Sequence, residues 1–313
     1  MIEVYGSDSP NAIVVLALGP GHFEKWQNYS LPSLRLYCSR NNLNLLAQVD
    51  SLDNSDSRKK FTWQKFLIPK SVKENFPKIK NFCYIDTDII CNPFAESIFD
   101  FIDDSSICLV SQFTNLPYSD DKILRRIAFF RNLLIDTNYP LDSSLFMKPK
   151  DIYAHHDFFE FNDYACAGMY MANVEYCYKT LESVYHKYSN KFNTITEGDE
   201  PVFNFEIQKN FKVKWLPYRF QILWNHEMAY KYPFLYTDFM ENSSAVKFSI
   251  LSSIMDGVFL HFAGNGYEKK AWEFSSFVVE KDYLSVLEKY NKYINTPVTG
   301  KPKGKFKFQL GEL

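Results

Sequence analysis

The stretch Asn81-Phe-Cys-Tyr-Ile-Asp-Thr-Asp-Ile-Ile-Cys-Asn-Pro93 decides the predicted fold, because an apolar, strand-like run ends there in two aspartates before a proline. Residues i and i+2 of a strand project to the same side, so Asp86 and Asp88 converge only if the pair leaves the sheet or binds a cation. Mg²⁺ and Mn²⁺ take oxygen ligands and keep positions open for substrate phosphates. The pattern therefore predicts a metal–phosphate site at the carboxyl end of a strand, with a solvated acidic turn as the alternative.

Size and composition indicate a globular protein with a substantial core. The chain has 313 residues, of which 46% are hydrophobic and 23% charged, enough for one large α/β domain or two small ones. Its 29 Phe and 21 Tyr residues favour core filling over stacking on sugars or bases. The formal net charge of −2 provides no basic field that would hold nucleic acid, so no nucleic-acid partner is expected.

Cysteine usage and hydropathy predict a soluble, cytoplasmic protein. The cysteines lie in apolar or helical contexts without a CxxC pair, which indicates reduced, buried thiols. No cationic and apolar leader precedes the first predicted strand, and the longest apolar runs are far shorter than the ~18 residues that span a bilayer. Residues 122–135 predict a basic amphipathic helix that can lie on an anionic membrane or cover a site, although an ordinary helix with its apolar face inward fits the same pattern.

Strands and helices alternate along the chain. Residues 11–18 form a continuous apolar run, which predicts a parallel strand buried on both faces and ended by Gly19-Pro-Gly21. Because loops at the carboxyl ends of parallel strands commonly bind ligands, Leu18 and Gly19 are candidate ligand contacts. Further predicted elements are helices near 31–38, around Lys65, over 175–188 and over 280–294, and strands over 44–49, 107–113 and 212–217.

Later segments carry other residues suited to a ligand site. Residues 140–163 are irregular and predict a long active-site or acceptor loop. The small residues of Ala165-Cys-Ala-Gly168 allow a ligand to approach the backbone closely. Asp199 and Glu200 stand at the predicted start of a helix. Their negative charges either stabilise the positive N-terminus of that helix or take part in catalysis. His261 follows an apolar strand and precedes a segment with glycines and lysines.

The stretches around Asp86–Asp88, 165–173, 199–204 and 261–272, taken in this order, resemble the retaining glycosyltransferases with a GT-A fold. They are most similar to those grouped with family 8, such as glycogenin and lipopolysaccharide galactosyltransferases. The resemblance covers most of residues 12–272. It implies that Asp86-Thr87-Asp88 and His261 hold Mn²⁺ (or Mg²⁺) and that Lys65 contacts the donor.

The chain departs from the family pattern at several positions. The motif Asn-x-Gly-x-Met-x-x-Asn resembles the segment 165–173 with its first Asn replaced, and Asp-Gln-x-x-Leu-Asn resembles 199–204 with Glu200 in place of Gln. The motif His-Phe-x-Gly-x-x-Lys-Pro-Trp resembles the segment from His261 through Gly264 to Lys269 and Lys270, with a longer spacing and no Pro. The resemblance implies that Lys269 or Lys270 contacts the diphosphate of the donor.

We therefore expect an α/β protein of GT-A type, with a Rossmann-like mixed, mainly parallel sheet flanked by helices in a single domain. That domain would span 1–275, with a nucleotide-sugar half over 1–115 and an acceptor half over 116–275, and a C-terminal helix and basic tail would follow over 276–313. The expected activity is Mn²⁺-dependent transfer of a hexose from a UDP-sugar to a saccharide or lipid-linked acceptor in polysaccharide biosynthesis, with Asp199 and Glu200 as catalytic residues. Retention follows only from the resemblance.

Two other functions fit the same residues. A phosphatase or phosphotransferase of the haloacid type also places Asp-x-Asp after an apolar strand, but its nucleophilic aspartate normally belongs to the first strand of its domain, whereas a βαβ-like segment comes first here. A catalytically silent sugar-binding protein could keep the fold, because a fold does not prove turnover.

Overall fold

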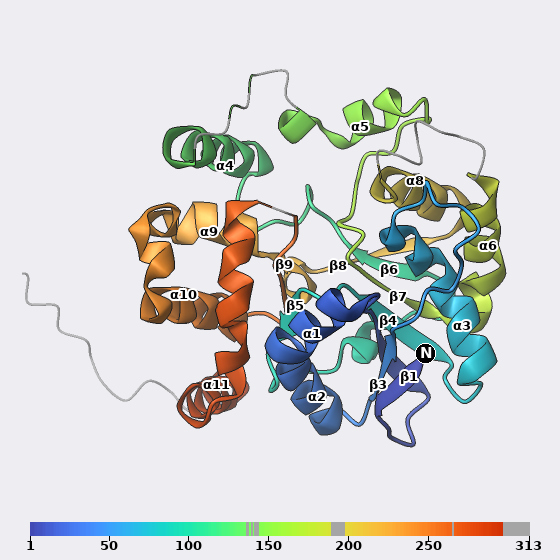
Figure 1. Ribbon diagram of the computed structural model, residues 1–313, viewed down its shortest axis with the longest axis horizontal. Coiled ribbons are helices and arrows are strands. Elements are labelled where there is room, and N and C mark those ends of the chain that lie inside the picture. The colour runs from blue at the N-terminus through green and yellow to red at the C-terminus, as the bar shows by residue number, and fades with distance from the viewer. Residues whose placement is uncertain (136–137, 139, 141–143, 189–197, 265, 297–313) are drawn as a thin grey trace, which may run out of the picture.

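A seven-stranded mixed sheet lies at the centre of the computed structural model, which describes residues 1–135, 138, 140, 144–188, 198–264 and 266–296 (Figure 1). Its strand order is β1-β3-β2-β4-β7-β6-β8. Strand β2 pairs in parallel with β3 and β4, and β6 pairs in parallel with β8, whereas β1–β3, β4–β7 and β6–β7 are antiparallel. The strands are β1 (Ile2–Tyr5), β2 (Asn11–Leu16), β3 (Asn44–Gln48), β4 (Asn81–Ile85), β6 (Ile107–Val110), β7 (Met169–Asn173) and β8 (Val213–Leu216).

Helices cover both faces of this sheet, which explains why β2 is apolar from Ala12 onward. Residues 12, 14 and 16 pack with the 3-10 helix η1 (Phe61–Leu67) and with α3 (Ile68–Asn75), α6 (Val174–Lys187) and α8 (Glu200–Asn210). Residues 13, 15 and 17 pack on the opposite face with α1 (Pro20–Tyr29) and α2 (Leu31–Arg40). The two-residue period of a strand thus divides one run between two cores. The predicted α/β class with a mixed sheet flanked by helices is confirmed.

A second, three-stranded sheet forms a separate core beside the first. It consists of β5 (Ile89–Cys91), β9 (Ile222–Leu223) and β10 (Phe259–His261), in the order β5-β10-β9. Helices α4 (Asp120–Leu134), α9 (Trp224–Lys231), α10 (Ser243–Met255) and α11 (Lys281–Ile294) and the 3-10 helix η7 (Tyr267–Val279) supply its apolar packing. In Figure 1, α4, α9, α10 and α11 lie together on the side away from α3, α6 and α8.

Some expectations about single elements are wrong. The run over 140–163 is not one loop, because its described part contains the short 3-10 helix η3 (Ser144–Phe146) and α5 (Pro149–His155). A proline in the first helical turn starts α5, since that position needs no N–H donor. The strand expected over 107–113 ends at Val110, and the segment around Lys65 is a 3-10 helix. The basic tail beyond 296 lies outside the described residues.

Candidate functional site

The link between β4 and β5 carries both aspartates out of the large sheet. The backbone N–H of Asp86 donates to the carbonyl of Gly168 at 2.8 Å, and the N–H of Phe262 donates to the carbonyl of Asp88 at 3.0 Å. Strand β10 pairs antiparallel with β5 so that His261 lies opposite Ile89, the residue after Asp88. The small sheet therefore delivers the imidazole to the carboxyl end of β4.

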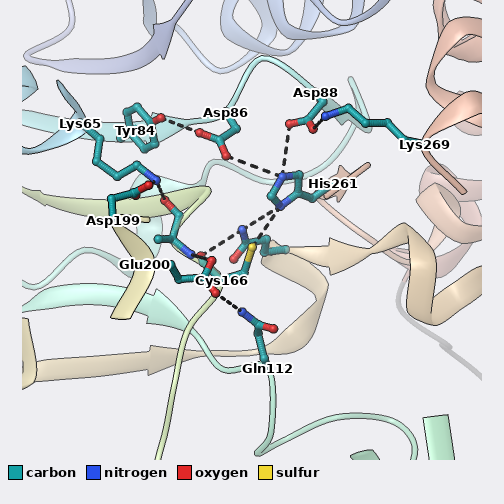
Figure 2. A network of polar contacts seen from close by, with 12 residues as sticks. Lys65, Tyr84, Asp86, Asp88, Gln112, Cys166, Asp199, Glu200, His261 and Lys269 are labelled. Atoms are coloured by element: carbon teal, nitrogen blue, oxygen red, sulfur yellow. Dashed lines mark hydrogen bonds and ion pairs between the residues drawn. The ribbon is translucent and has the colours of Figure 1, made fainter. Parts of the chain in front are cut away.

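Asp86, Asp88 and His261 form a compact group of possible metal ligands. One ligand atom from each lies within 4.8 Å of the other two. The His261 Nε2 atom is 3.2 Å from Asp88 Oδ1 and 3.9 Å from Asp86 Oδ2 (Figure 2). Asp88 and His261 are buried, whereas Asp86 is half-buried.

Gly168, directly before β7, leaves the space that this group needs. A Cβ atom at position 168 would collide with the His261 imidazole and lie 2.8 Å from Asp86 Oδ2. Two carboxylates and one imidazole suit Mn²⁺, which accepts nitrogen more readily than Mg²⁺ does. The donor set and the glycine-lined space thus fit a divalent cation held by Asp86, Asp88 and His261.

A lysine balances part of this negative charge. The Lys269 ammonium group lies 2.7 Å from Asp88 Oδ2. Burial opposes ionisation of Asp88, but His261 and Lys269 outweigh it and hold the pKa of this carboxyl at about 2. The carboxylate is therefore ionised at neutral pH.

On the other side of the site, Lys65 and Asp199 form a buried ion pair. Their Nζ and Oδ2 atoms are 2.7 Å apart, and Lys65 also donates to the carbonyl of Ala167 at 2.9 Å. Burial would raise the pKa of Asp199, but the Lys65 ammonium group lowers it below its usual range. The Asp199 side chain makes no capping hydrogen bond to α8, so its partner is the lysine and not the helix end.

The neighbouring acid, Glu200, has a different environment. It is half-buried, and its Oε2 accepts from the N–H of Ala167 at 3.1 Å while its Oε1 accepts from Gln112 at 3.4 Å. Burial raises the pKa of Glu200 above its usual range. Figure 2 shows Glu200 between Asp199 and Gln112, below the cluster around His261.

These groups line one cavity of about 680 Å³, called the main cavity below. The predicted site residues on its wall are Lys65, Asp86, Thr87, Asp88, Asp199, Glu200, His261, Gly264 and Lys269. Leu18 and Gly19 do not line it: Leu18 packs against the hydrophobic core, and Leu16 reaches the cavity instead. Lys270 lies in a neighbouring hollow, where its ammonium group is 4.7 Å from the Tyr267 ring centroid.

Sequence reasoning missed one part of the wall. It consists of His22, Lys25, Lys60, Phe61 and Thr62. The rings of His22 and Phe61 lie 4.9 Å apart although their segments are separated in sequence. The sequence did contain a signal, because Lys59, Lys60 and Phe61 lie a few residues before Lys65. That α1 lies beside them is apparent only from the fold.

Other expectations concern the surface and the thiols. The cysteines at 38, 83, 91, 108, 166 and 177 are free and buried, as predicted.

Helix α4 buries Ile123 and Ile127 and exposes Phe129 and Leu133. Among the described residues, no helix has the length and apolar character required to cross a membrane.

Comparisons with known proteins give structural likeness only. No protein-family model and no curated protein sequence matches the chain. It is similar to a glycosyltransferase involved in the glycosylation of the major capsid of PBCV-1, with 11% identity and a TM-score of 0.49 over 84% of this chain and 98% of the other. It is also similar to the galactosyltransferase LgtC in complex with donor and acceptor sugar analogs, with 10% identity and a TM-score of 0.45 over 91% of this chain and 97% of the other. A third similar structure is the glycosyltransferase GlyE of Streptococcus pneumoniae TIGR4, with 12% identity and a TM-score of 0.44 over 93% of this chain and 66% of the other.

Proposed function

We propose that this chain is a divalent-metal-dependent glycosyltransferase that moves a hexose from a UDP-sugar to a hydroxyl group of a saccharide or lipid-linked glycan. The observation that carries the proposal is the grouping of Asp86, Asp88 and His261 in the main cavity at the carboxyl end of β4. Folds with parallel strands commonly bind ligands at such strand ends. The sequence motifs that resemble glycosyltransferases of family 8 support the UDP-sugar donor and a reaction with retention.

The first half of the site suits a diphosphate leaving group. Asp86, Asp88 and His261 would hold Mn²⁺ or Mg²⁺, which when bound supplies positive charge to the phosphate oxygens. Lys269, half-buried beside Asp88, adds a second positive charge on the same wall. Lys25 and Lys60 line the cavity as well, so the chain's own cations can stabilise a dianionic group there.

The second half of the site suits the sugar. Positive charge develops on the sugar ring as the bond to the diphosphate breaks, and a carboxylate nearby stabilises it. Asp199 is held ionised by Lys65, and Lys65 is itself fixed to the carbonyl of Ala167. This ion pair offers a rigid polar wall to the hexose.

Glu200 is the residue suited to the acceptor proton. The acceptor oxygen forms a bond to the anomeric carbon, the bond from that carbon to the diphosphate oxygen breaks, and its electron pair leaves with the diphosphate. The hydroxyl proton passes to the Glu200 carboxylate, which is more exposed than that of Asp199. Its raised pKa brings the carboxylate closer to the range of an effective general base.

Titration of UDP, with and without Mn²⁺, tests this function. We expect the chain to bind UDP at least about tenfold more tightly with Mn²⁺ and to release UDP from one member of a panel of UDP-sugars. Asp88→Asn should remove the effect of Mn²⁺, while Asp104→Asn, at an exposed position outside the cavity, should keep it.

Each rival function predicts a different result. Mn²⁺-dependent UDP binding without release from any UDP-sugar would contradict the enzyme and indicate a sugar-binding protein. Hydrolysis of phosphate monoesters without UDP binding would indicate a haloacid-type phosphatase. If the affinity for UDP is the same with and without Mn²⁺, the metal assignment is contradicted.

Membrane contact through residues 122–135 is part of the proposal. Helix α4 presents Phe129 and Leu133 to solvent with exposed fractions of 57% and 63%, and Arg125 lies on its exposed surface. Aromatic and aliphatic side chains beside basic ones suit the surface of an anionic bilayer.

A further inference from the structure

A second cavity, of about 310 Å³, adjoins the main cavity. The two share four lining residues, Cys166, Glu200, Ala263 and Gly264, so the carboxylate of Glu200 is accessible from both sides. From there the second cavity extends to Gln112 after β6, to α4, and to the start of α9. Its volume lies at the lower end of the range for small-molecule sites, about 300–1,000 Å³. It is large enough for a compact ligand at the edge of the reaction centre.

His226, in the first turn of α9, lines this cavity with an unsatisfied imidazole. The residue is 5% exposed, and its Nδ1 is buried without a hydrogen-bond partner. The ring contacts Tyr118 edge-on, at 5.9 Å between centroids, a contact that gives Nδ1 no hydrogen-bond partner. A buried polar group without a hydrogen-bond partner is unfavourable, and a ligand hydroxyl group bonded to this imidazole would offset that cost.

The imidazole is neutral at physiological pH. Burial lowers the pKa of His226 to about 4, and the nearby Arg131 guanidinium contributes in the same direction. A neutral imidazole has one N–H donor and one acceptor nitrogen. It can therefore donate to one hydroxyl group and accept from another.

The remaining lining favours an uncharged ligand. Arg131 is engaged by Glu268, with its Nε and Nη2 atoms each 2.8 Å from a carboxylate oxygen. No lysine is found among the described residues that line the second cavity, whereas Glu200 would repel an anion. Gln112 and Asn225 add amides that both donate and accept. This set matches the hydroxyl groups of a sugar ring.

We propose that the second cavity is the acceptor subsite, that it binds a neutral pyranose ring, and that His226 selects this ring through its hydroxyl groups. The inference rests on the proposed function, because it places the acceptor hydroxyl group between Glu200 and the anomeric carbon of the donor. The hydroxyl oxygen forms the new glycosidic bond, its proton goes to Glu200, and the electron pair of the broken bond leaves with the diphosphate. His226 takes no part in this step and acts on specificity.

Binding of simple glycosides tests the proposal. The full chain, with UDP and Mn²⁺ present, is titrated by saturation-transfer NMR with methyl β-D-galactopyranoside, methyl β-D-glucopyranoside and, as an anionic probe, methyl β-D-glucuronide. We expect a neutral glycoside to bind and His226→Phe to weaken it at least about tenfold, the effect of losing one hydrogen bond to a buried group. His226→Gln, whose amide donates and accepts, should recover most of the affinity. His186→Phe, on the exposed side of α6, is the matched control and should bind like the unmodified chain.

Three results would overturn the proposal: no neutral glycoside binds to the unmodified chain, the glucuronide binds best, or His226→Phe binds the neutral glycosides as tightly as before. Titration of UDP and Mn²⁺ in the same samples separates this failure from failure of the proposed function. If UDP binds with Mn²⁺ and the glycosides do not, only the acceptor subsite is wrong. Should His226→Phe fail to fold, Asn225→Ala provides the same comparison at the neighbouring lining residue.

Discussion

At the scale of single residues, two adjacent acids have separate environments and therefore separate expected roles. Asp199 is buried in an ion pair with Lys65, whereas Glu200 is half-buried and lines both cavities. We predict that Asp199→Asn keeps the affinities for UDP and Mn²⁺ but lowers turnover at least ~100-fold, because the lost charge acts mainly in the transition state. Steady-state kinetics and UDP titration measure the two effects.

A purely structural role for Asp199 would give the opposite pattern. Turnover per folded molecule would stay unchanged, whereas a lower melting temperature is expected for either role, because the substitution leaves the buried Lys65 ammonium group without its ion-pair partner. The absence of a capping hydrogen bond from the Asp199 side chain makes this outcome unexpected. Glu200→Gln keeps the shape of the neighbouring side chain but removes the proposed proton acceptor, so turnover should fall in this variant as well, by less than in Asp199→Asn.

The residues found from sequence are those whose chemistry is unusual for their position. Asp86 and Asp88 follow an apolar strand, and His261 ends another, so each is a polar group where an apolar one is expected. The prediction that Leu18 and Gly19 contact the ligand is wrong: it rests on the rule that strand ends commonly bind ligands, yet the residue of this segment that lines the cavity is Leu16. His226 gave no signal in the sequence, because its burial depends on α4 packing against α9.

At the scale of elements, the site depends on how closely the start of β7 approaches the turn after β4. These strands pair antiparallel with Ile85 opposite Met169, which places Gly168 beside the ligand group. We predict that Gly168→Ala reduces Mn²⁺ affinity at least about tenfold, because the added methyl group displaces His261 or Asp86. Isothermal titration with Mn²⁺ measures this effect.

Gly21→Ala provides a control in which the same methyl group meets no atom. No atom lies within 4 Å of a Cβ built at Gly21, which is in the first turn of α1. This variant should bind Mn²⁺ normally and fold at least as stably, since alanine favours helix more than glycine does. Equal Mn²⁺ affinity in both variants would show that the cation is not held at Gly168.

Secondary-structure elements could be predicted where burial produces a simple sequence pattern. After their first residues, Asn11 and Asn81, strands β2 and β4 are apolar because both faces are covered. Helices α9 and α10 were not predicted: α9 spans only eight residues, and α10 lies within an apolar core with buried residues on several sides, so neither gives a clear amphipathic pattern. Strand β1 is partly exposed at one edge of the sheet and equally lacks a pattern.

At the scale of the whole molecule, the candidate metal site joins the two sheets. Asp86 follows β4 of the large sheet, whereas His261 ends β10 of the small one, and β5 connects them through its antiparallel pairing with β10. Lys269 comes from η7, which packs against α1, α2 and α10. A cation bound by these residues would therefore connect segments that are distant in sequence.

This arrangement predicts that ligands stabilise the whole fold. A ligand present at 100 times its dissociation constant adds about 2.7 kcal/mol to the free energy of unfolding when it binds only the folded chain. For a chain of this size, about 1 kcal/mol corresponds to roughly 2 °C, so Mn²⁺ at that concentration should raise the melting temperature by about 5 °C. Differential scanning calorimetry at increasing Mn²⁺ measures the rise, and Asp88→Asn should abolish it while Asp104→Asn retains it, since only Asp88 belongs to the ligand group. A rise of equal size in Asp88→Asn would mean that Mn²⁺ binds elsewhere. The two sheets would then be held together by protein contacts alone.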